Sequence, residues 1–437
     1  MRIYLETLGC RLNYAEMAAL GRQVTGAGHL LAASPDQADI CVLNSCAVTG
    51  DAARKSRQIA RQMVRANPDA RLLVTGCYAT LEGEAIAELP NVSLVVGNAR
   101  KDQLLEMICD LGKAQRADDL AQPSPSESTG LHGALRSWFM SRTRAFVKVQ
   151  DGCHNRCTFC IVTVARGAER SRSIAAVVEE INDLHREGYQ EAVITGVHLG
   201  AYGRDLDTDL RSLMGALLED TAIPRLRLSS LEPFDLMPGF FGLWVQSGGR
   251  LMPHLHLPAQ SGSDTVVRRM ARRNSVSDFE ALALAARKAI PGLTITTDLI
   301  AGFPGETEAN FEETVNFARR VGFAHLHVFT YSARSGTAAA RFSAQVPQAE
   351  RRRRSRVLTG LGSELGHNVR SSLLGDTRPV LWEKSKATAD GAVLWTGLTD
   401  NYIRVLAEAP AGSDLHNCVS AVRLARVDGN DLWGEIV

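Results

Sequence analysis

Three cysteines, Cys153, Cys157 and Cys160, lie within eight consecutive residues of the chain. Thiols this close in sequence are too crowded to pair with one another as disulfides, and they are one thiolate short of a tetrahedral four-cysteine metal site. A cube-shaped iron–sulfur cluster held by three thiolates leaves one iron free to bind another molecule, as a catalytic zinc keeps one position open. The spacing therefore predicts a reactive iron–sulfur cluster.

A structural zinc site is the alternative interpretation of the same residues. It would take its fourth ligand from a distant part of the chain or from His154, which directly follows Cys153. Short cysteine motifs of this kind also occur in zinc sites, so the spacing by itself leaves this alternative open.

The residues before this loop predict a separate α/β domain. Short β-rich runs at 2–8, 39–44, 71–75 and 94–96 alternate with helical patterns such as 13–24 and 51–65. This alternation is typical of a doubly wound parallel sheet. We expect residues 1–112 to form an amino-terminal domain of this class.

Three further cysteines follow strands of that predicted sheet. Cys10 comes after the first strand, Cys46 after the second and Cys77 after the third, whereas Cys41 and Cys109 do not lie at strand ends. The carboxyl ends of parallel strands share one edge, where open sheets bind ligands. The placement predicts a second metal site of three thiolates. Three unrelated buried cysteines are the alternative, because free cysteine is a common core residue.

The central part of the chain predicts a partial barrel. Residues 113–135 have the composition of a linker, and residues 136–345 contain six β-rich runs, with helical patterns between most of them. Six such units imply a partial (β/α)6 barrel, whose active site would form at the carboxyl ends of the strands. The loop with Cys153 follows the first of these strands. The predicted strands are 145–150, 192–196, 225–230, 254–258, 294–301 and 325–331.

The last part of the chain predicts a helical connector and a small β-barrel. Residues 346–374 carry a helical pattern with four consecutive arginines at 351–354, which favours a solvated helix face over a phosphate site. Residues 375–437 contain β-rich runs at 378–383, 392–396, 402–406 and 420–427. A barrel of this size is of the type that binds nucleic acid.

The spacing Cys-x3-Cys-x2-Cys, with Phe159 just before the last cysteine, resembles the signature of the radical S-adenosylmethionine (SAM) enzymes. The resemblance implies that SAM binds the open iron and that one electron then cleaves SAM into a 5′-deoxyadenosyl radical. The runs 150–161 and 165–167 resemble the methylthiotransferase branch of that family, which replaces an unactivated C–H bond with C–SCH3.

The sequence around Cys10, Cys46 and Cys77 resembles the amino-terminal domain of the same branch. That resemblance implies two [4Fe-4S] clusters, with SAM as a further cofactor. The ends of the barrel strands also resemble the family, and this implies a set of residues near SAM, although Glu232 could instead cap a helix. The implied cofactor-binding residues are Phe159, Thr195, Gly196, Ser229, Glu232, Gln260 and Ile300.

Two regions predict contacts with RNA. Residues 397–405 resemble the TRAM module of RNA-modifying methylthiotransferases, and a basic helix follows Cys46. The net charge is only +1, but residues 136–172 carry eight basic and two acidic side chains around the cysteine loop, which fits an anionic substrate such as tRNA. The predicted RNA-binding residues are Arg54, Lys55, Arg57, Trp395, Tyr402 and Arg404.

The runs 53–58 and 196–203 resemble the branch of the MtaB type, which acts on N6-threonylcarbamoyladenosine beside the tRNA anticodon. This implies methylthiolation of adenine C2 at nucleotide 37. Within the family, isopentenyladenosine in tRNA or an aspartate of a ribosomal protein is an alternative substrate. A non-catalytic iron–sulfur RNA-binding protein is the alternative from another class, which the vacant ligand position of each three-cysteine site disfavours.

Composition places the protein in a reducing compartment. Nine cysteines in 437 residues are few for a secreted disulfide scaffold, and the first residues are too short and polar a segment for a signal peptide. No apolar run has the length of a membrane span. We expect a cytoplasmic monomer that receives electrons from a donor such as a flavodoxin or ferredoxin.

Overall fold

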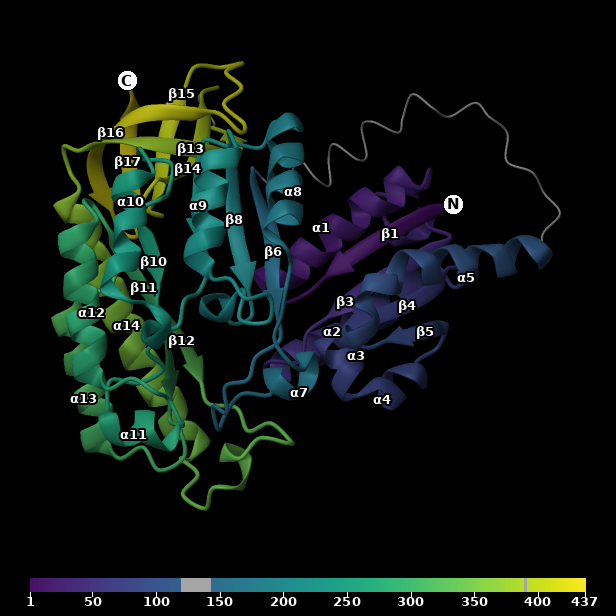
Figure 1. Ribbon diagram of the computed structural model, residues 1–437, viewed down its shortest axis with the longest axis horizontal. Coiled ribbons are helices and arrows are strands. Elements are labelled where there is room, and N and C mark those ends of the chain that lie inside the picture. Colours follow the sequence, from purple (N-terminus) through teal and green to yellow (C-terminus); the bar gives the residue numbers. More distant parts are fainter. Residues whose placement is uncertain (119–142, 389–390) are drawn as a thin grey trace. The chain divides into compact units, whose positions relative to one another are not determined.

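The computed structural model describes residues 1–118, 143–388 and 391–437 (Figure 1). The chain forms two compact units. Unit 1 comprises the amino-terminal part together with 151–155 and 160–168, and unit 2 comprises 143–150, 156–159 and 169–437. The cysteine loop is thus divided between the units, and the barrel and the carboxyl-terminal domain belong to the same unit.

Unit 1 contains the predicted doubly wound sheet. Its five strands follow the order β2-β1-β3-β4-β5, and every pair is parallel. All six residues of β3 are buried, as expected for a strand that has neighbours on both sides and helices on both faces. The strands are β1 (Arg2–Thr7), β2 (Leu30–Leu31), β3 (Ile40–Ser45), β4 (Arg71–Gly76) and β5 (Val92–Val96).

Alternate residues of these strands pack against different helices. Val42 packs with Met17 of one helix and Ile108 of another, whereas its neighbour Leu43 packs with Ala60. The period of two along a strand therefore divides the core between the two faces of the sheet. The helices are α1 (Arg11–Gly26), α2 (Gly50–Ala66), α3 (Cys77–Leu81), α4 (Gly83–Ala87), α5 (Leu104–Asp118) and α7 (Val162–Arg166), with 3-10 turns η1 (Pro35–Gln37) and η2 (Asn98–Gln103).

Helix α5 continues through Asp118, beyond the predicted domain boundary at residue 112. The predicted linker 113–135 therefore begins inside a helix, because residues 113–118 (Lys-Ala-Gln-Arg-Ala-Asp) are mostly good helix formers and include no Gly or Pro. Residues 119–135 of that linker, and 136–142 of the predicted barrel domain, lie outside the described residues.

Unit 2 contains the predicted partial barrel. All six predicted strands are found, in two sheets of order β7-β6-β8-β9 and β10-β11-β12 that isolated bridges connect, such as the bridge between Ser230 and His256. The paired strands are parallel where their register is given. The strands are β6 (Arg144–Asp151), β7 (Arg170–Ser171), β8 (Glu191–Gly196), β9 (Arg225–Leu228), β10 (His254–His256), β11 (Thr294–Ala301) and β12 (His325–Thr330).

The helices of the barrel have clear boundary signals. Ser275 and Thr307 each form a capping box with the residue three positions later, and Gly322 ends a helix with φ +64°. Phe279, Phe317 and Phe323 pack edge to face beneath them. The helices are α8 (Ile174–Arg186), α9 (Leu210–Asp220), α10 (Gly242–Gln246), α11 (Asp264–Arg269), α12 (Val276–Ala289) and α13 (Glu308–Val321), with 3-10 turns η3 (Leu199–Ala201), η4 (Pro233–Asp235), η5 (Pro238–Phe241) and η6 (Ala339–Arg341).

The predicted connector is the long helix α14 (Gln348–Ser372), which packs along β12 (Figure 1). Its arginine run is only partly solvated. Arg354 is buried and donates to the carboxylate of Glu306 at 2.8 Å, and Arg351 donates to the backbone oxygen of Tyr331 at 2.9 Å. Arg353 also pairs with Glu308 of α13 at 2.6 Å, so three of the four arginines attach the helix to the barrel.

The carboxyl-terminal domain is a closed five-stranded barrel of order β13-β14-β15-β17-β16. Four of its strands were predicted, and the fifth, β17, follows a turn at Gly429, whose φ is +57°. The strands are β13 (Thr377–Ala387), β14 (Val393–Thr399), β15 (Arg404–Ala409), β16 (Val419–Asp428) and β17 (Asp431–Ile436). Across the described parts of both units, we find no helix with the length and apolarity that a membrane crossing requires.

Candidate iron–sulfur sites

Cys10, Cys46 and Cys77 lie at one edge of the sheet of unit 1. Cys10 caps the start of α1 after β1, Cys46 follows β3, and Cys77 begins α3 after β4. These three strands are neighbours and end in register, with Asn44 opposite both Thr7 and Thr75. The thiols of Cys10 and Cys77 are close enough to Cys46 to influence its pKa. The structure therefore brings these three cysteines together.

The backbone around these thiols is tightly packed at two glycines. A Cβ atom on Gly9, whose φ is +109°, would lie 2.7 Å from the Sγ of Cys46. A Cβ atom on Gly76, whose φ is +100°, would lie 2.3 Å from the backbone oxygen of Ser45. Glycine alone tolerates both the dihedral angle and the close approach. Three convergent thiols are a donor set that fits an iron–sulfur cluster.

A buried network of charges lies beside these cysteines. Lys101 donates to Glu16 at 2.5 Å and to Asn44 at 3.0 Å. Arg166 donates to the other oxygen of Glu16 at 2.9 Å and to Asp151 at 3.0 Å. None of these charged side chains is more than 7% exposed. Buried charges at this density persist only when they are paired and hydrogen-bonded, as they are here.

The network also acts on the thiols. The pKa of the Cys46 thiol is raised to about 11, mainly by burial and further by the thiols of Cys10 and Cys77. The positive charge of Arg166 acts in the opposite direction and lowers this pKa. Burial disfavours the charge of Arg166, but Glu16, Cys77 and Asp151 outweigh burial and raise its pKa well above the ordinary value. Arg166 therefore remains cationic and favours the thiolate form that a metal ligand requires.

The second cysteine group lies in the loop between β6 and β7, and part of that loop belongs to unit 1. Gly152, with φ +74°, begins the loop, and the N–H of Cys153 donates to the oxygen of Gly167 at 3.1 Å. The N–H of Asn155 points at the Sγ of Cys153 and the N–H of Val162 at that of Cys160, each at 3.4 Å. Such donors stabilise a bound thiolate and help to set the potential of a cluster.

The middle of the loop is anchored inside unit 2. The backbone N–H of Thr158 donates to Met270 and its hydroxyl to Arg269, both at 3.0 Å, and its oxygen accepts from Ala339 at 2.9 Å. Phe159 packs edge to face on Phe303 with ring centres 6.5 Å apart. These contacts fix the segment that carries Cys157.

Arg272 connects Cys157 to a predicted SAM contact. Its guanidinium is 1% exposed, donates to Glu232 at 3.0 Å, forms an ion pair with the other oxygen of that carboxylate at 2.6 Å and also hydrogen-bonds the thiol of Cys157. Sequence analysis did not identify Arg272, because Arg272-Arg273 reads as an ordinary basic turn after α11. Only the fold shows that one of the two arginines points inward.

The other predicted cofactor residues lie at the carboxyl ends of the barrel strands. Thr195 and Gly196 end β8, and Ile300 lies near the end of β11. Ser229 has a buried hydroxyl without a hydrogen-bond partner among the described residues, and Gln260 adopts φ +67° beside β11. The structure brings these residues to the predicted end of the barrel, where their contacts with SAM remain a prediction.

The predicted RNA-binding residues differ in their surroundings. On α2, Lys55 is exposed, Arg54 pairs with Asp51 at 2.9 Å, and Arg57 donates to the Tyr78 hydroxyl at 2.6 Å. In the carboxyl-terminal barrel, Arg404 is exposed and pairs with Asp431.

The two aromatic residues among the predicted RNA contacts differ in burial. Trp395 is 3% exposed in the core of the small barrel, which leaves it no surface for stacking on a base. The prediction of Trp395 as an RNA contact is therefore corrected, because the alternation along β14 points its ring inward. Tyr402 stacks on His254 with ring centres 4.5 Å apart but is partly exposed, so its contact with RNA stays a prediction.

Two family models match the chain. Residues 2–97 match a family described as an uncharacterized protein family, UPF0004, and residues 147–318 match the radical SAM superfamily. The first match covers the sheet with Cys10, Cys46 and Cys77, and the second covers the cysteine loop and the barrel from β6 into α13.

Curated relatives match most of the chain. The protein is 36% identical to the threonylcarbamoyladenosine tRNA methylthiotransferase MtaB of Bacillus subtilis, over 92% of this chain and 90% of that protein. It is 34% identical to MtaB of Thermotoga maritima, over 89% of this chain and 88% of that protein. It is also 30% identical to a tRNA-2-methylthio-N(6)-dimethylallyladenosine synthase of Anaplasma phagocytophilum, over 100% of this chain and 98% of that protein.

Solved structures support the fold. The radical SAM methyltransferase TsrM of Kitasatospora setae matches with a TM-score of 0.58 at 13% identity, over 78% of this chain and 77% of that one. The cobalamin-dependent radical SAM enzyme OxsB matches with a TM-score of 0.52 at 12% identity, over 78% of this chain and 55% of that one. Together with the identities to the curated relatives, the cysteine loop and the barrel confirm the predicted family: this chain is an enzyme of the radical SAM methylthiotransferase family.

Proposed function

We propose that the protein methylthiolates adenine C2 of N6-threonylcarbamoyladenosine at nucleotide 37 of tRNA, with SAM as radical source and methyl donor. The names of the most similar relatives support this substrate, since several MtaB proteins match at 32–36% identity. Relatives named for dimethylallyladenosine match at 30–34%, so isopentenyladenosine is the second candidate.

One observation carries the proposal beyond these names. Helix α7 directly follows Cys160 and packs against α3, which begins at Cys77, within unit 1 (Figure 1). The amide of Asn98 donates to the oxygen of Ala165 at 2.7 Å and lies 3.7 Å from the Sγ of Cys77. The loop of one cysteine group is therefore fixed to the surroundings of the other, as a reaction that uses both groups would require.

The residues divide the work as follows. Cys153, Cys157 and Cys160 would hold the [4Fe-4S] cluster that the radical SAM family implies, and Cys10, Cys46 and Cys77 would hold a second one. When bound, the first cluster and SAM supply a radical that removes a hydrogen from a carbon that no side-chain base can deprotonate.

Other side chains would support the cofactors and the substrate. Arg272 would keep Glu232 oriented toward SAM, and Arg166 would keep positive charge beside the second group. Exposed basic side chains on α2 and on the small barrel would bind the tRNA backbone. A flavodoxin or ferredoxin is the class of partner that supplies the electron.

Nucleoside analysis of tRNA from cells that lack the gene tests the substrate. We expect threonylcarbamoyladenosine to lose its 2-methylthio group while other modified nucleosides stay unchanged. Loss of the group from the dimethylallyl nucleoside instead would support the second candidate. Unchanged tRNA together with an unmodified ribosomal-protein aspartate would overturn both.

Iron analysis tests the second cluster separately. Two reconstituted clusters correspond to about eight irons per chain, and we expect Cys10→Ala to remove about half of them. Cys109→Ala is the matched control, because Cys109 lies on α5 away from the strand ends and should leave the iron content unchanged. Full iron content in Cys10→Ala would leave Cys10 without a ligand role.

A further inference from the structure

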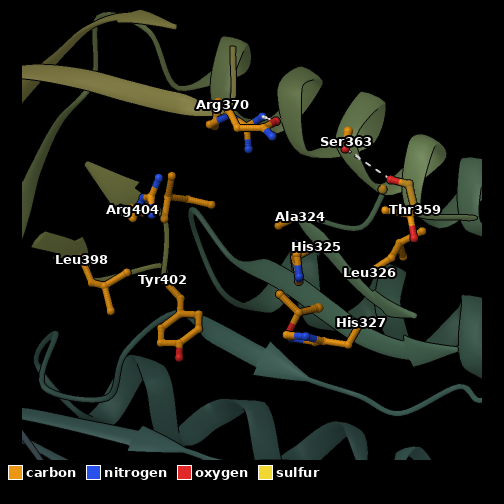
Figure 2. Close-up of a pocket in the computed structure, with 14 residues that line it drawn as sticks. Ala324, His325, Leu326, His327, Thr359, Ser363, Arg370, Leu398, Tyr402 and Arg404 are labelled. Atoms are coloured by element: carbon orange, nitrogen blue, oxygen red, sulfur yellow. Dashed lines mark hydrogen bonds between the residues drawn. The ribbon is translucent and has the colours of Figure 1, made fainter. Parts of the chain in front are cut away.

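A cavity of about 450 Å³ lies at the opposite end of the barrel from the predicted SAM residues (Figure 2). Its floor comes from the amino-terminal halves of β11 and β12, one wall from α14, and the other wall from the small barrel. The whole cavity belongs to unit 2. Its size is in the range of small-molecule sites, and it is separate from the end where SAM is expected.

The top of this cavity is positively charged, because Arg370 and Arg404 both line it. Arg370 of α14 has a buried Nε without a hydrogen-bond partner, and the only contact of its terminal nitrogens with a polar side chain among the described residues is with Asn430 at 3.3 Å. No carboxylate of the described residues lies within ion-pair distance of Arg370. Arg404, which also lines the cavity, pairs with Asp431 at 2.5 Å. Two guanidinium groups thus share the carboxylate of Asp431, which pairs directly with Arg404 and acts on Arg370 from a longer distance, so this arrangement favours an anionic ligand.

The floor of the cavity has an imidazole available to a ligand. His325 contacts His327 edge to face, with ring centres 4.4 Å apart, and its ring nitrogens have no hydrogen-bond partner among the described residues. Burial lowers the pKa of His325, and His256 and Arg370 lower it further. The ring is therefore neutral at pH 7, and it offers one donor and one acceptor.

The rest of the lining is apolar or neutral. Leu326, Leu398 and Ile403 supply aliphatic surface, and Thr359 and Ser363 supply hydroxyls along α14 (Figure 2). No carboxylate side chain is among the described residues that line the cavity. An apolar wall with a neutral imidazole suits the ring of a nucleobase, and the paired arginines suit a phosphate.

We propose that this cavity binds a phosphorylated nucleotide, with the phosphate at Arg370 and Arg404 and the base between His325 and the aliphatic wall. A metal cation is a poor ligand for this cavity, because the two arginines would repel it. A purely apolar ligand is also poor, because it would leave Arg370 without an ion-pair partner. The same chemistry comes from two sources, a free mononucleotide or one nucleotide of the bound RNA. The RNA source rests on the proposed function, and the nucleotide would then be distant from the one that reacts.

Binding of 5′-AMP and of an unmodified tRNA transcript to the full-length protein tests the proposal. Calorimetry without SAM measures the first and filter binding the second. We expect Arg370→Gln to weaken the binding of 5′-AMP at least about tenfold, because it removes a charge-assisted contact with phosphate. Arg319→Gln is the matched control, because this half-exposed arginine of α13 lies outside the cavity and should have no effect on 5′-AMP.

The two sources give different results. An equal loss of tRNA affinity in Arg370→Gln identifies the RNA as the source, and unchanged tRNA affinity identifies a free nucleotide. Arg404→Gln carries the 5′-AMP test if Arg370→Gln does not fold, because the Arg404 side chain is 59% exposed.

If neither ligand loses affinity in either variant, the proposal is overturned. The binding experiment tests the cavity, whereas iron analysis and nucleoside analysis test the proposed function. A negative result for the cavity therefore leaves the proposed function unaffected.

Discussion

Both cysteine groups are predicted to bind an iron–sulfur cluster, but the fold brings their cysteines together in different ways. Cys10, Cys46 and Cys77 come from three strand ends, and Cys46 and Cys77 are buried. The other group occupies one loop, and each of its thiols is partly exposed. The first group is assembled by the fold of a whole sheet, whereas the second depends on local contacts of a single segment.

Because of this difference, substitutions in the first group should affect both metal binding and the stability of the fold, whereas substitutions in the loop should affect mainly metal binding. A change in the first group alters buried side chains that also pack the domain core, where Cys77 contacts Tyr78 and Ile86 within one apolar cluster. A change in the loop alters a ligand but little of the core. Substitutions should therefore reveal which group is part of the fold.

Ligand removal is the largest test of this comparison. We expect both Cys46→Ala and Cys153→Ala to reduce methylthiolation to background, because each removes one of three cluster ligands. In the metal-free protein, Cys46→Ala should lower the free energy of unfolding by about 1 kcal/mol, and Cys153→Ala by less than about 0.5 kcal/mol. Urea denaturation measures both, and equal losses of stability would contradict the distinction.

The next largest expected effect is a loss of stability on substitution of Glu191, which lies at the amino-terminal end of the barrel strands. This end supports β6, the strand that leads into the cysteine loop. Glu191 of β8 is opposite Arg144 of β6 and accepts from Arg225 at 2.8 Å and Arg227 at 2.7 Å. Burial raises the pKa of Glu191, but the arginines outweigh it and lower the pKa to about 2. We expect Glu191→Gln to destabilise unit 2 by about 3–5 kcal/mol at pH 7, because it leaves two buried arginines without a carboxylate.

The dependence on pH follows from the lowered pKa. Stability from Glu191 is fully present above the ordinary value of 4.5 and is lost as the pH falls toward 2. The difference between wild type and Glu191→Gln in urea denaturation should therefore be constant from pH 7 to about 5 and shrink below. A difference that is the same at pH 3 and pH 7 would contradict the assignment of the charge.

Gly76→Ala tests the first group with a smaller change. The added Cβ would lie 2.3 Å from the oxygen of Ser45, at φ +100°. We expect a loss of about 2–3 kcal/mol in stability and a loss of iron at the first group alone, because the strain displaces Cys77. Gly83→Ala is the control, since its Cβ would make an ordinary contact of 3.7 Å with Val95. Iron loss from both groups would show that the loop depends on the sheet.

The sequence predicted most of the fold because its signals are local. The strand bounds of β11 were predicted to the residue, since its apolar run is flanked by clear breaks. The strand-end positions of Cys10, Cys46 and Cys77 also followed from the alternation of strands and helices. Family resemblance added the cofactors and the residues at the strand ends.

The features that sequence analysis missed depend on which way a side chain points. Arg272 and Arg273 are adjacent, and only the first is buried. Trp395 was predicted as an RNA contact from its residue type, but its ring is buried in the small barrel. The unpaired charge of Arg370 has no signature in a single sequence, because the missing partner is a property of the folded surroundings.

Substitution of Arg272 has the smallest expected effect and is the most direct test of the cysteine loop, because Arg272 contacts Cys157. We expect Arg272→Gln to weaken SAM binding about tenfold, because Glu232 and Cys157 lose a shared charged partner, while the iron of the first group stays unchanged. Equilibrium dialysis with SAM and iron analysis measure these quantities, and Arg272→Lys should restore part of the affinity. Arg273→Gln is the control, since Arg273 is exposed over the ring of Phe234. Equal effects of the two arginines would mean that surface charge, rather than the buried contact with the loop, supports SAM binding.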